Sequence, residues 1–156
     1  WASGIFKTTL SYTVSKSTRS NPTRVNYPHA YDQTHIIDFI PSIDQNNNWK
    51  ISSRVRYVTG NPFTPIVGGN FDADNDVYLP IRGGFYSERM SPFMQVDLRL
   101  DKKWIYDRWI LTAYLDIQNI LNKKNPESLQ YSYDYSKSSV VSGLPFFPSI
   151  GLKGEF

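Results

Sequence analysis

The sequence has no cysteine, only two histidines and no long apolar run, and each shortage excludes a class of protein. Without cysteine there is neither a disulfide scaffold nor a cysteine-ligated zinc site. No stretch approaches the ~20 consecutive apolar residues that a membrane-spanning helix needs. HExxH, GxSxG and glycine-rich phosphate motifs do not occur either. We therefore predict neither a helical membrane protein nor an enzyme, and we predict no cofactor.

The sequence has no large excess of charge of either sign: it contains 17 basic and 14 acidic residues, and its net charge is +3. The basic residues are scattered and usually stand two positions from an acid, as in Asp97, Arg99 and Asp101. A nucleic-acid surface would gather them in one stripe, so we predict no nucleic-acid partner. Aromatic residues are abundant at 15%, while the mean hydropathy of −0.44 shows that apolar residues are dispersed among polar ones.

Apolar and polar residues alternate along several segments, which is the period of a β-strand. The clearest is Gln95–Asp101, where every even position is aliphatic and every odd position is polar or charged. With their flanks, these segments match the ~9–11 residues of a tilted strand that crosses a bilayer. The six predicted strands are Phe6–Val14, His35–Ile43, Ile51–Tyr57, Gln95–Asp101, Trp109–Leu121 and Phe146–Phe156.

The connections between these strands alternate in length. Two are short, 44–48 and 105–108, two are long and without a predicted strand, 61–92 and 123–144, and one, 19–32, is intermediate. Short turns at one end and long loops at the other are typical of an outer-membrane barrel. We predict an all-β fold, a transmembrane antiparallel β-barrel in meander order, of which residues 1–156 provide about six strands. A soluble β-sandwich is the alternative.

Aromatic residues lie near both ends of the predicted strands. Rings that are partly polar favour the two water–lipid interfaces of a membrane, where they form girdles. The positions predict one girdle at the short-turn end and one at the long-loop end. The first contains Trp49, Trp104, Trp109 and Phe156, and the second contains Tyr12, Tyr57 and Phe93.

The last strand ends in phenylalanine, with alternating apolar residues at Phe146, Ile150 and Leu152 before it. It resembles the C-terminal recognition strand of Gram-negative outer-membrane proteins. This resemblance implies that Phe156 is a signal read by the barrel assembly machinery.

Four further segments sharpen the resemblance: Tyr31–His35, Arg54–Pro65, Asp97–Asp101 and Leu115–Asn122. In this order and with these gaps, they are similar to the last barrel strands of a TonB-dependent outer-membrane receptor. The likeness covers nearly the whole chain. It implies energised uptake of a scarce nutrient (siderophore, vitamin, glycan or peptide) across the Gram-negative outer membrane. It also implies outer-membrane lipid, a plug domain and the TonB complex as partners.

Receptors of this family have about 22 strands around a plug, whereas six strands are fewer than the ~8 of the smallest closed barrels. An open sheet edge in lipid is strongly unfavourable. We therefore expect residues 1–156 to be the C-terminal portion of a longer receptor whose plug and TonB-contacting segment lie elsewhere. The alternatives are a passive porin or structural barrel without TonB coupling, including one assembled from several short chains, and a soluble β-sandwich binding protein.

The alternation assigns the charged strand residues to the lumen, because a charge on the lipid face costs about 2–4 kcal/mol near the midplane. They are interpreted either as wall residues paired across strands or as contacts for the plug. The predicted lumen-facing residues are Arg54, Arg56, Asp97, Arg99, Asp101, Asp116, Gln118, Lys153 and Glu155.

The long loops are the predicted place for substrate. Aromatic, polar loops suit stacking on sugars or on planar siderophore rings, although such residues also pack on one another. The candidates are Tyr78, Phe85, Tyr86, Glu88, Arg89, Tyr131, Tyr133 and Tyr135.

Three loop acids, Asp72, Asp74 and Asp76, have the spacing of the first ligands of a calcium loop. An EF-hand is excluded because Val77 stands where glycine is needed and Gly83 where the bidentate glutamate is needed. A looser calcium site and solvated loop acids are the interpretations left open.

Overall fold

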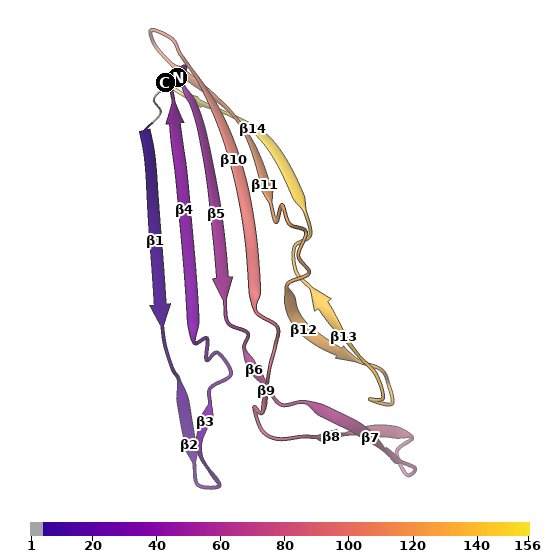
Figure 1. The fold of residues 1–156 in the computed structure, drawn as a ribbon. Helices are drawn as coiled ribbons and strands as arrows, with labels where there is room; N and C mark the ends of the chain where they lie inside the picture. Colours follow the sequence, from indigo (N-terminus) through magenta and orange to yellow (C-terminus); the bar gives the residue numbers. More distant parts are fainter. Residues whose placement is uncertain (1–4) are drawn as a thin grey trace.

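A computed structural model describes residues 5–156, which form strands, turns and connections without a helix (Figure 1). No helix in that range is therefore long and apolar enough to span a membrane. Six long strands form one antiparallel sheet in the order β1-β4-β5-β10-β11-β14. They are β1 (Ile5–Val14), β4 (His35–Gln45), β5 (Trp49–Val58), β10 (Phe93–Ile105), β11 (Ile110–Gln118) and β14 (Phe147–Glu155).

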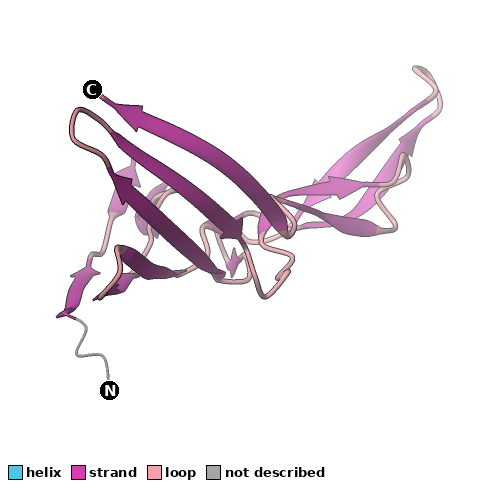
Figure 2. Ribbon diagram, turned by 90° about the horizontal axis from the view of Figure 1, so that it is seen from above, coloured by secondary structure: helices cyan, strands magenta, loops and turns pink. Residues whose placement is uncertain are grey.

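The predicted all-β antiparallel meander is thus confirmed, and each predicted strand coincides with one of these six. The sheet is open, because β1 and β14 form its two edges and do not pair within residues 5–156 (Figure 2). Several strand ends differ from the prediction. The strand predicted over Gln95–Asp101 is longer in the structure, where β10 spans Phe93–Ile105. The strand predicted over Trp109–Leu121 ends earlier, at Gln118, because Asn119 has a φ of 51° and turns the chain.

The two short connections lie together at one end of the sheet, which we call the short-turn end (Figure 1). Asn47 and Asn48, with φ of 73° and 60°, form the tight turn between β4 and β5. Asparagine is one of the few residues that adopt this left-handed conformation readily, so an Asn-rich turn suits the position.

The long connections were predicted to lack strands, and this was wrong. They extend beyond the opposite, long-loop end of the sheet and form three small two-stranded sheets, and the connection between β1 and β4 forms a fourth. Their strands are too short to be recognised by an alternation of apolar and polar residues over the length of a membrane-spanning strand. The pairs are β2 (Thr18–Asn21) with β3 (Arg24–Pro28), β6 (Pro62–Phe63) with β9 (Glu88–Arg89), β7 (Ile66–Asp72) with β8 (Val77–Arg82), and β12 (Pro126–Tyr131) with β13 (Ser138–Ser142).

The register gives the main sheet two chemically different faces. Leu115 lies opposite Leu100 on one side and Ile150 on the other, whereas the next residue, Asp116, lies opposite Arg99 and Ser149. We call these the apolar face and the polar face. No layer within residues 5–156 covers either of them. Among residues 5–24 and 26–156, Val58, 5% exposed, is the one buried hydrophobic side chain besides Pro62. The sheet therefore has no core of its own.

Aromatic side chains gather at the short-turn end, as predicted. The Trp109 ring stacks between Tyr106, at 4.8 Å, and Phe156, at 6.1 Å. The Lys102 ammonium lies 5.0 Å from the Trp49 ring and 6.0 Å from the Trp104 ring, a cation–π arrangement.

The second predicted girdle contains one error. Tyr12 and Tyr57 lie on the apolar face, opposite Ile37 in both cases. Phe93 instead shares the parity of Gln95 and lies on the polar face, where the Arg56 guanidinium is 5.8 Å from its ring. Phe93 was assigned to the girdle because it lies near a strand end. Which face it occupies depends instead on whether its position along the strand is odd or even.

Candidate functional site

The polar face brings together the charged residues that were predicted to face a lumen. Asp38 on β4 accepts a hydrogen bond of 2.9 Å from Nε of Arg54 and lies 3.9 Å from Nε of Arg56. Two arginines on β5 thus share one carboxylate across the strand pair. The predicted residues that the register places on this face are Arg54, Arg56, Asp97, Arg99, Asp101, Asp116, Gln118, Lys153 and Glu155.

A second group of charges continues across β10 and β11. The Arg99 guanidinium lies 2.9 Å from the Asp101 carboxylate, 3.9 Å from that of Asp116 and 4.3 Å from the centre of the Tyr114 ring. Each such pair contributes at most about 1 kcal/mol when solvated. Together they make a polar surface on which the charges of these acids and bases largely neutralise one another, because each has a partner of opposite sign.

Asparagines that the sequence pattern did not single out hold the loops against this polar face. Asn119 is fully buried: its backbone N–H donates to Asp97, its Nδ2 donates to the carbonyls of Lys123 and Leu144, and its Oδ1 accepts from the Lys123 N–H. Asn125, 3% exposed, accepts from the Met94 N–H. The cluster holds the start of β12 beside the start of β10.

A buried ion pair ties three other connections together. Asp32, 4% exposed, accepts from the Ser17 N–H and forms a salt bridge with Arg89. Arg89 also donates to the Gly60 carbonyl at 3.1 Å. The Ser17 N–H and the Arg89 guanidinium keep the pKa of Asp32 below its usual value, against the opposing effect of burial. Arg89 was predicted as a loop candidate for substrate contact. It instead holds the loops together with Asp32, and we call this ion pair with its hydrogen bonds the Asp32–Arg89 clamp.

Glycine is needed where this clamp brings two backbones together. A Cβ built on Gly60 would lie 1.8 Å from the Met90 carbonyl oxygen. The close approach is accompanied by a backbone hydrogen bond from the Met90 N–H to the Asn61 carbonyl at 3.0 Å. The connection after β5 and the connection before β10 thus run side by side at this point.

Other loop candidates pack on one another. Tyr27 contacts Phe85 edge-on at 5.0 Å and stacks on Tyr86 at 6.3 Å, while Phe85 lies 4.3 Å beneath the Arg24 guanidinium. Glu88 lies on the two-residue strand β9 and is exposed. Tyr86 and Phe85 therefore join their loop to the β2–β3 hairpin.

A second aromatic contact bridges the β7–β8 and β12–β13 hairpins. Tyr133 meets Tyr78 edge-on at 5.5 Å, and its hydroxyl donates to the Asp76 carbonyl at 2.7 Å. Tyr131 and Tyr135 face each other within the second hairpin at 6.1 Å. Two loops that are 57 residues apart in sequence are thereby held together at their tips.

Replacing Tyr133 by phenylalanine is expected to loosen this bridge. The change removes one hydrogen bond, worth about 1 kcal/mol, and keeps the ring. Spin labels on Ala73→Cys and Ser136→Cys should show a broader distance distribution in the variant. Tyr131→Phe is the matched control and should leave the distribution unchanged, and equal distributions for both variants would contradict the assignment.

The aspartates that were considered for calcium are not gathered. Residues 5–156 hold no group of three or more acidic or histidine side chains arranged for a metal ion. Asp72 instead accepts from the Asp74 N–H at 3.1 Å and from Nδ2 of Asn75 at 2.8 Å, and this lowers its pKa. Asp72 thus stabilises the β7–β8 turn.

Asp134 has a similar role in the β12–β13 turn. Hydrogen bonds from Ser132 and Ser136 lower its pKa from 3.8 to about 2. Because the folded-state pKa is depressed, this contribution to turn stability is present above pH ~4 and is lost as the pH falls through about 2. The Ser136 amide resonance should titrate with a midpoint near pH 2, and a midpoint near pH 4 would contradict the two hydrogen bonds.

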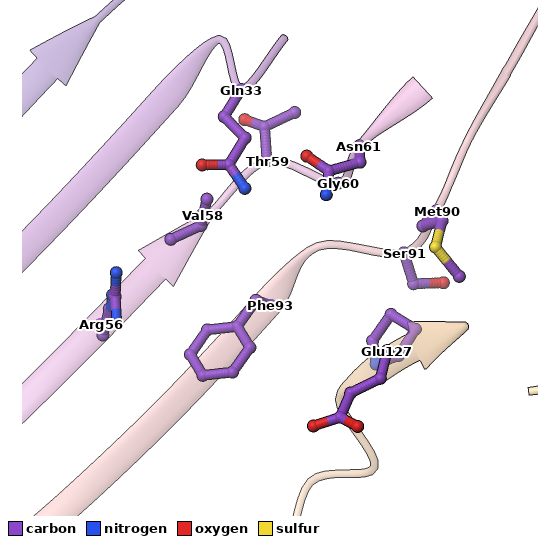
Figure 3. A pocket seen from close by; sticks show the side chains of 11 residues that line it. Gln33, Arg56, Val58, Thr59, Gly60, Asn61, Met90, Ser91, Phe93 and Glu127 are labelled. Atoms are coloured by element: carbon purple, nitrogen blue, oxygen red, sulfur yellow. The ribbon is translucent and has the colours of Figure 1, made fainter. Parts of the chain in front are cut away.

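The loops enclose a pocket at the long-loop end of the polar face (Figure 3). Its volume is about 210 Å³, and it lies between the end of β5, the start of β10 and the start of β12. A second pocket of about 460 Å³ shares Met90, Ser91 and Pro126 with it. Only one predicted site residue, Arg56, lines the first pocket. Apart from Val58 at the end of β5 and Phe93 at the start of β10, its other lining residues belong to connections whose placement the sequence pattern did not indicate.

Comparison of the chain with models of protein families, with curated proteins and with solved structures finds no match.

Proposed function

We propose that this chain is the C-terminal part of the barrel wall of a TonB-dependent outer-membrane transporter. The observation that carries the proposal is the division of a single-layer sheet of six strands into a predominantly apolar face, whose one β10 charge, Lys102, lies at the short-turn end, and a polar face. In a barrel wall, lipid contacts the first face and the hydrated lumen contacts the second. The sheet needs no covering layer in that setting, which accounts for exposed side chains such as Leu152, at 72%.

The two open edges support a longer wall. β1 and β14 each have one side that pairs with no other strand in residues 5–156. Unpaired backbone groups in lipid cost several kcal/mol each, so further strands of the receptor pair with both edges and close the barrel. Tyr106, Trp109 and Phe156 then lie at the periplasmic interface, and the hairpins lie outside the cell.

The transport mechanism follows from the resemblance of the strand motifs to this family. Nutrient binds on the outer side, and the TonB complex acts on the plug to open a path along the polar face. The paired charges, such as Arg99 with Asp101, keep that path wettable without a strong net field. They are also the groups with which a plug would exchange hydrogen bonds.

The proposal is tested on the full receptor in its native cells. It should remain in the urea-washed outer membrane, migrate faster on gels before heating than after, and cross-link to TonB in living cells. A barrel that shows the mobility shift but never cross-links to TonB would instead be a passive porin or structural barrel. Recovery in the soluble fraction without detergent would contradict both and favour a soluble β-sheet protein.

A further inference from the structure

The apolar face of the main sheet holds one residue that does not match its surroundings. Across the six long strands, Lys102 is the one Asp, Glu, Lys or Arg that the register places on that face. It lies opposite Trp49 on one side and Ala113 on the other, close to the short-turn end of β10. In a bilayer, a lysine near the interface costs about 0–1 kcal/mol, far less than at the midplane. The position therefore suits a cation at the level of the lipid headgroups.

The Lys102 ammonium keeps part of its hydrogen-bonding capacity. It donates to the carbonyl of Asn47 in the turn between β4 and β5, and the rings of Trp49 and Trp104 lie 5.0 and 6.0 Å from it. It forms no salt bridge within residues 5–156. An ammonium has three N–H donors, so two remain for acceptors outside this part of the chain. Indole rings favour the same interface, which fixes the depth of the cation.

The apolar face is hollowed beside this cation. A groove of about 320 Å³ is lined by Lys102, Ala113 and the side chains around them. Ala113 has the smallest side chain on that face of β11, where its neighbours are leucine and isoleucine. Leu100, Leu115 and Ile150 lie opposite one another in the next row, farther from the short-turn end, and also line the groove. The groove thus leads from the ammonium toward the middle of the sheet along an apolar floor.

A cation at the interface with an apolar groove below it has the chemistry of a site for one lipid molecule. We propose that this site binds an anionic phospholipid of the leaflet at the short-turn end. Its phosphate accepts hydrogen bonds from Lys102, and the first part of one acyl chain lies over Ala113. An anionic lipid is favoured because a zwitterionic headgroup brings an ammonium of its own, which Lys102 repels. The inference rests on the proposed function, which puts the apolar face in lipid, and names a partner for that face.

The binding site is mapped with phosphatidylglycerol that carries a photoreactive diazirine in one acyl chain. The full receptor is reconstituted in phosphatidylcholine vesicles with a few per cent of this probe, and adducts are located by peptide mass spectrometry. Adducts should concentrate on the residues of β10 and β11 that line the groove. Diacylglycerol with the same labelled chain lacks the phosphate and should give much less adduct there.

Two neighbouring lysines provide the matched variants. Lys102→Gln should lower the adduct yield in the groove about tenfold, the effect of losing one charge-assisted hydrogen bond. Lys103→Gln removes the same charge one residue along β10, on the polar face, and should leave the yield unchanged. Lys102→Arg keeps a cation and should retain binding. Ala113→Leu fills the groove while keeping Lys102, so it should also lower the yield and provides a second variant if Lys102→Gln fails to fold.

Equal adduct yields for phosphatidylglycerol and diacylglycerol would mean contact with hydrocarbon alone and would overturn the proposal. Equal losses for Lys102→Gln and Lys103→Gln, adducts spread evenly over the apolar face, or no adduct in the groove would do the same. The gel-mobility shift and cross-linking to TonB would persist in each of those cases. Failure of the lipid site is therefore distinguishable from failure of the transporter assignment.

Discussion

Replacing Ile150 by arginine is expected to prevent stable insertion of the protein into a bilayer, whereas the same replacement at Ser149 is expected to be tolerated. The two residues are neighbours on β14 and point to opposite faces of the sheet. Ile150 lies opposite Leu115 on the apolar face and is 82% exposed. Ser149 lies opposite Asp116 on the polar face, where an added arginine gains a carboxylate partner.

The size of the effect depends on the solvent that covers the apolar face. Near the middle of a bilayer, an arginine that faces lipid costs about 2–4 kcal/mol. In water the same change at so exposed a position costs almost nothing, because surface substitutions usually stay within about 0.5 kcal/mol. The free energy of unfolding, measured by urea titration of the full receptor in lipid vesicles, should therefore fall only for Ile150→Arg. Equal stability of both variants would count against a lipid-facing sheet.

This pair of variants uses the part of the fold that the sequence predicted best. Alternation is a local property, since a strand places successive side chains on opposite faces whatever lies around it. The positions of Arg54, Asp97 and Arg99 on one face could therefore be read from a single chain, and the meander order followed from the lengths of the connections.

The loops could not be predicted in the same way, because their structure depends on contacts between distant segments. Asp32 and Arg89 are 57 residues apart, and no local pattern pairs them. Arg89 was predicted to contact substrate because it lies in a polar loop. The polarity of its sequence neighbours does not indicate which residue it contacts in the folded chain. Asn61 gave no signal at all, because its Oδ1 becomes buried without a hydrogen-bond partner in residues 5–156 only where three connections meet.

The asparagines lie between these two cases. Asparagine is a turn-forming residue, yet the predicted strand Trp109–Leu121 ran through Asn119, whose φ of 51° ends β11 at Gln118. The four hydrogen bonds that bury it involve Asp97, Lys123 and Leu144, which come from three separate parts of the chain. The alternation therefore predicted the strand but not where it ends, and it gave no sign that the turn after it anchors the loops.

Replacing Arg89 by leucine is expected to release the connections at the long-loop end. The variant leaves the Asp32 carboxylate 4% exposed without its cation, and it removes a donor from the Gly60 carbonyl. Removing one partner of a buried pair costs about 3–5 kcal/mol. Because the Arg89 side chain is 35% exposed, we expect about 3 kcal/mol, at the lower end of that range.

The loss should depend on pH in a defined direction. In the wild type the pKa of Asp32 is lowered, so the clamp stabilises the fold above pH ~4 and weakens as the pH falls through the folded-state pKa. The deficit of Arg89→Leu relative to the wild type should therefore be largest near neutral pH and shrink in acid. Hydrogen exchange of the Ser17 amide, which donates to Asp32, reports this opening directly.

Two further variants separate the clamp from a general effect of losing an arginine. Arg82→Leu on the exposed strand β8 removes an arginine that forms no salt bridge within residues 5–156, and it should leave Ser17 exchange unchanged. Adding Asp32→Asn to Arg89→Leu removes the stranded charge, so the double variant should recover part of the lost stability. Additive losses in this cycle would mean that the two residues act independently and that the ion pair does not hold the loops.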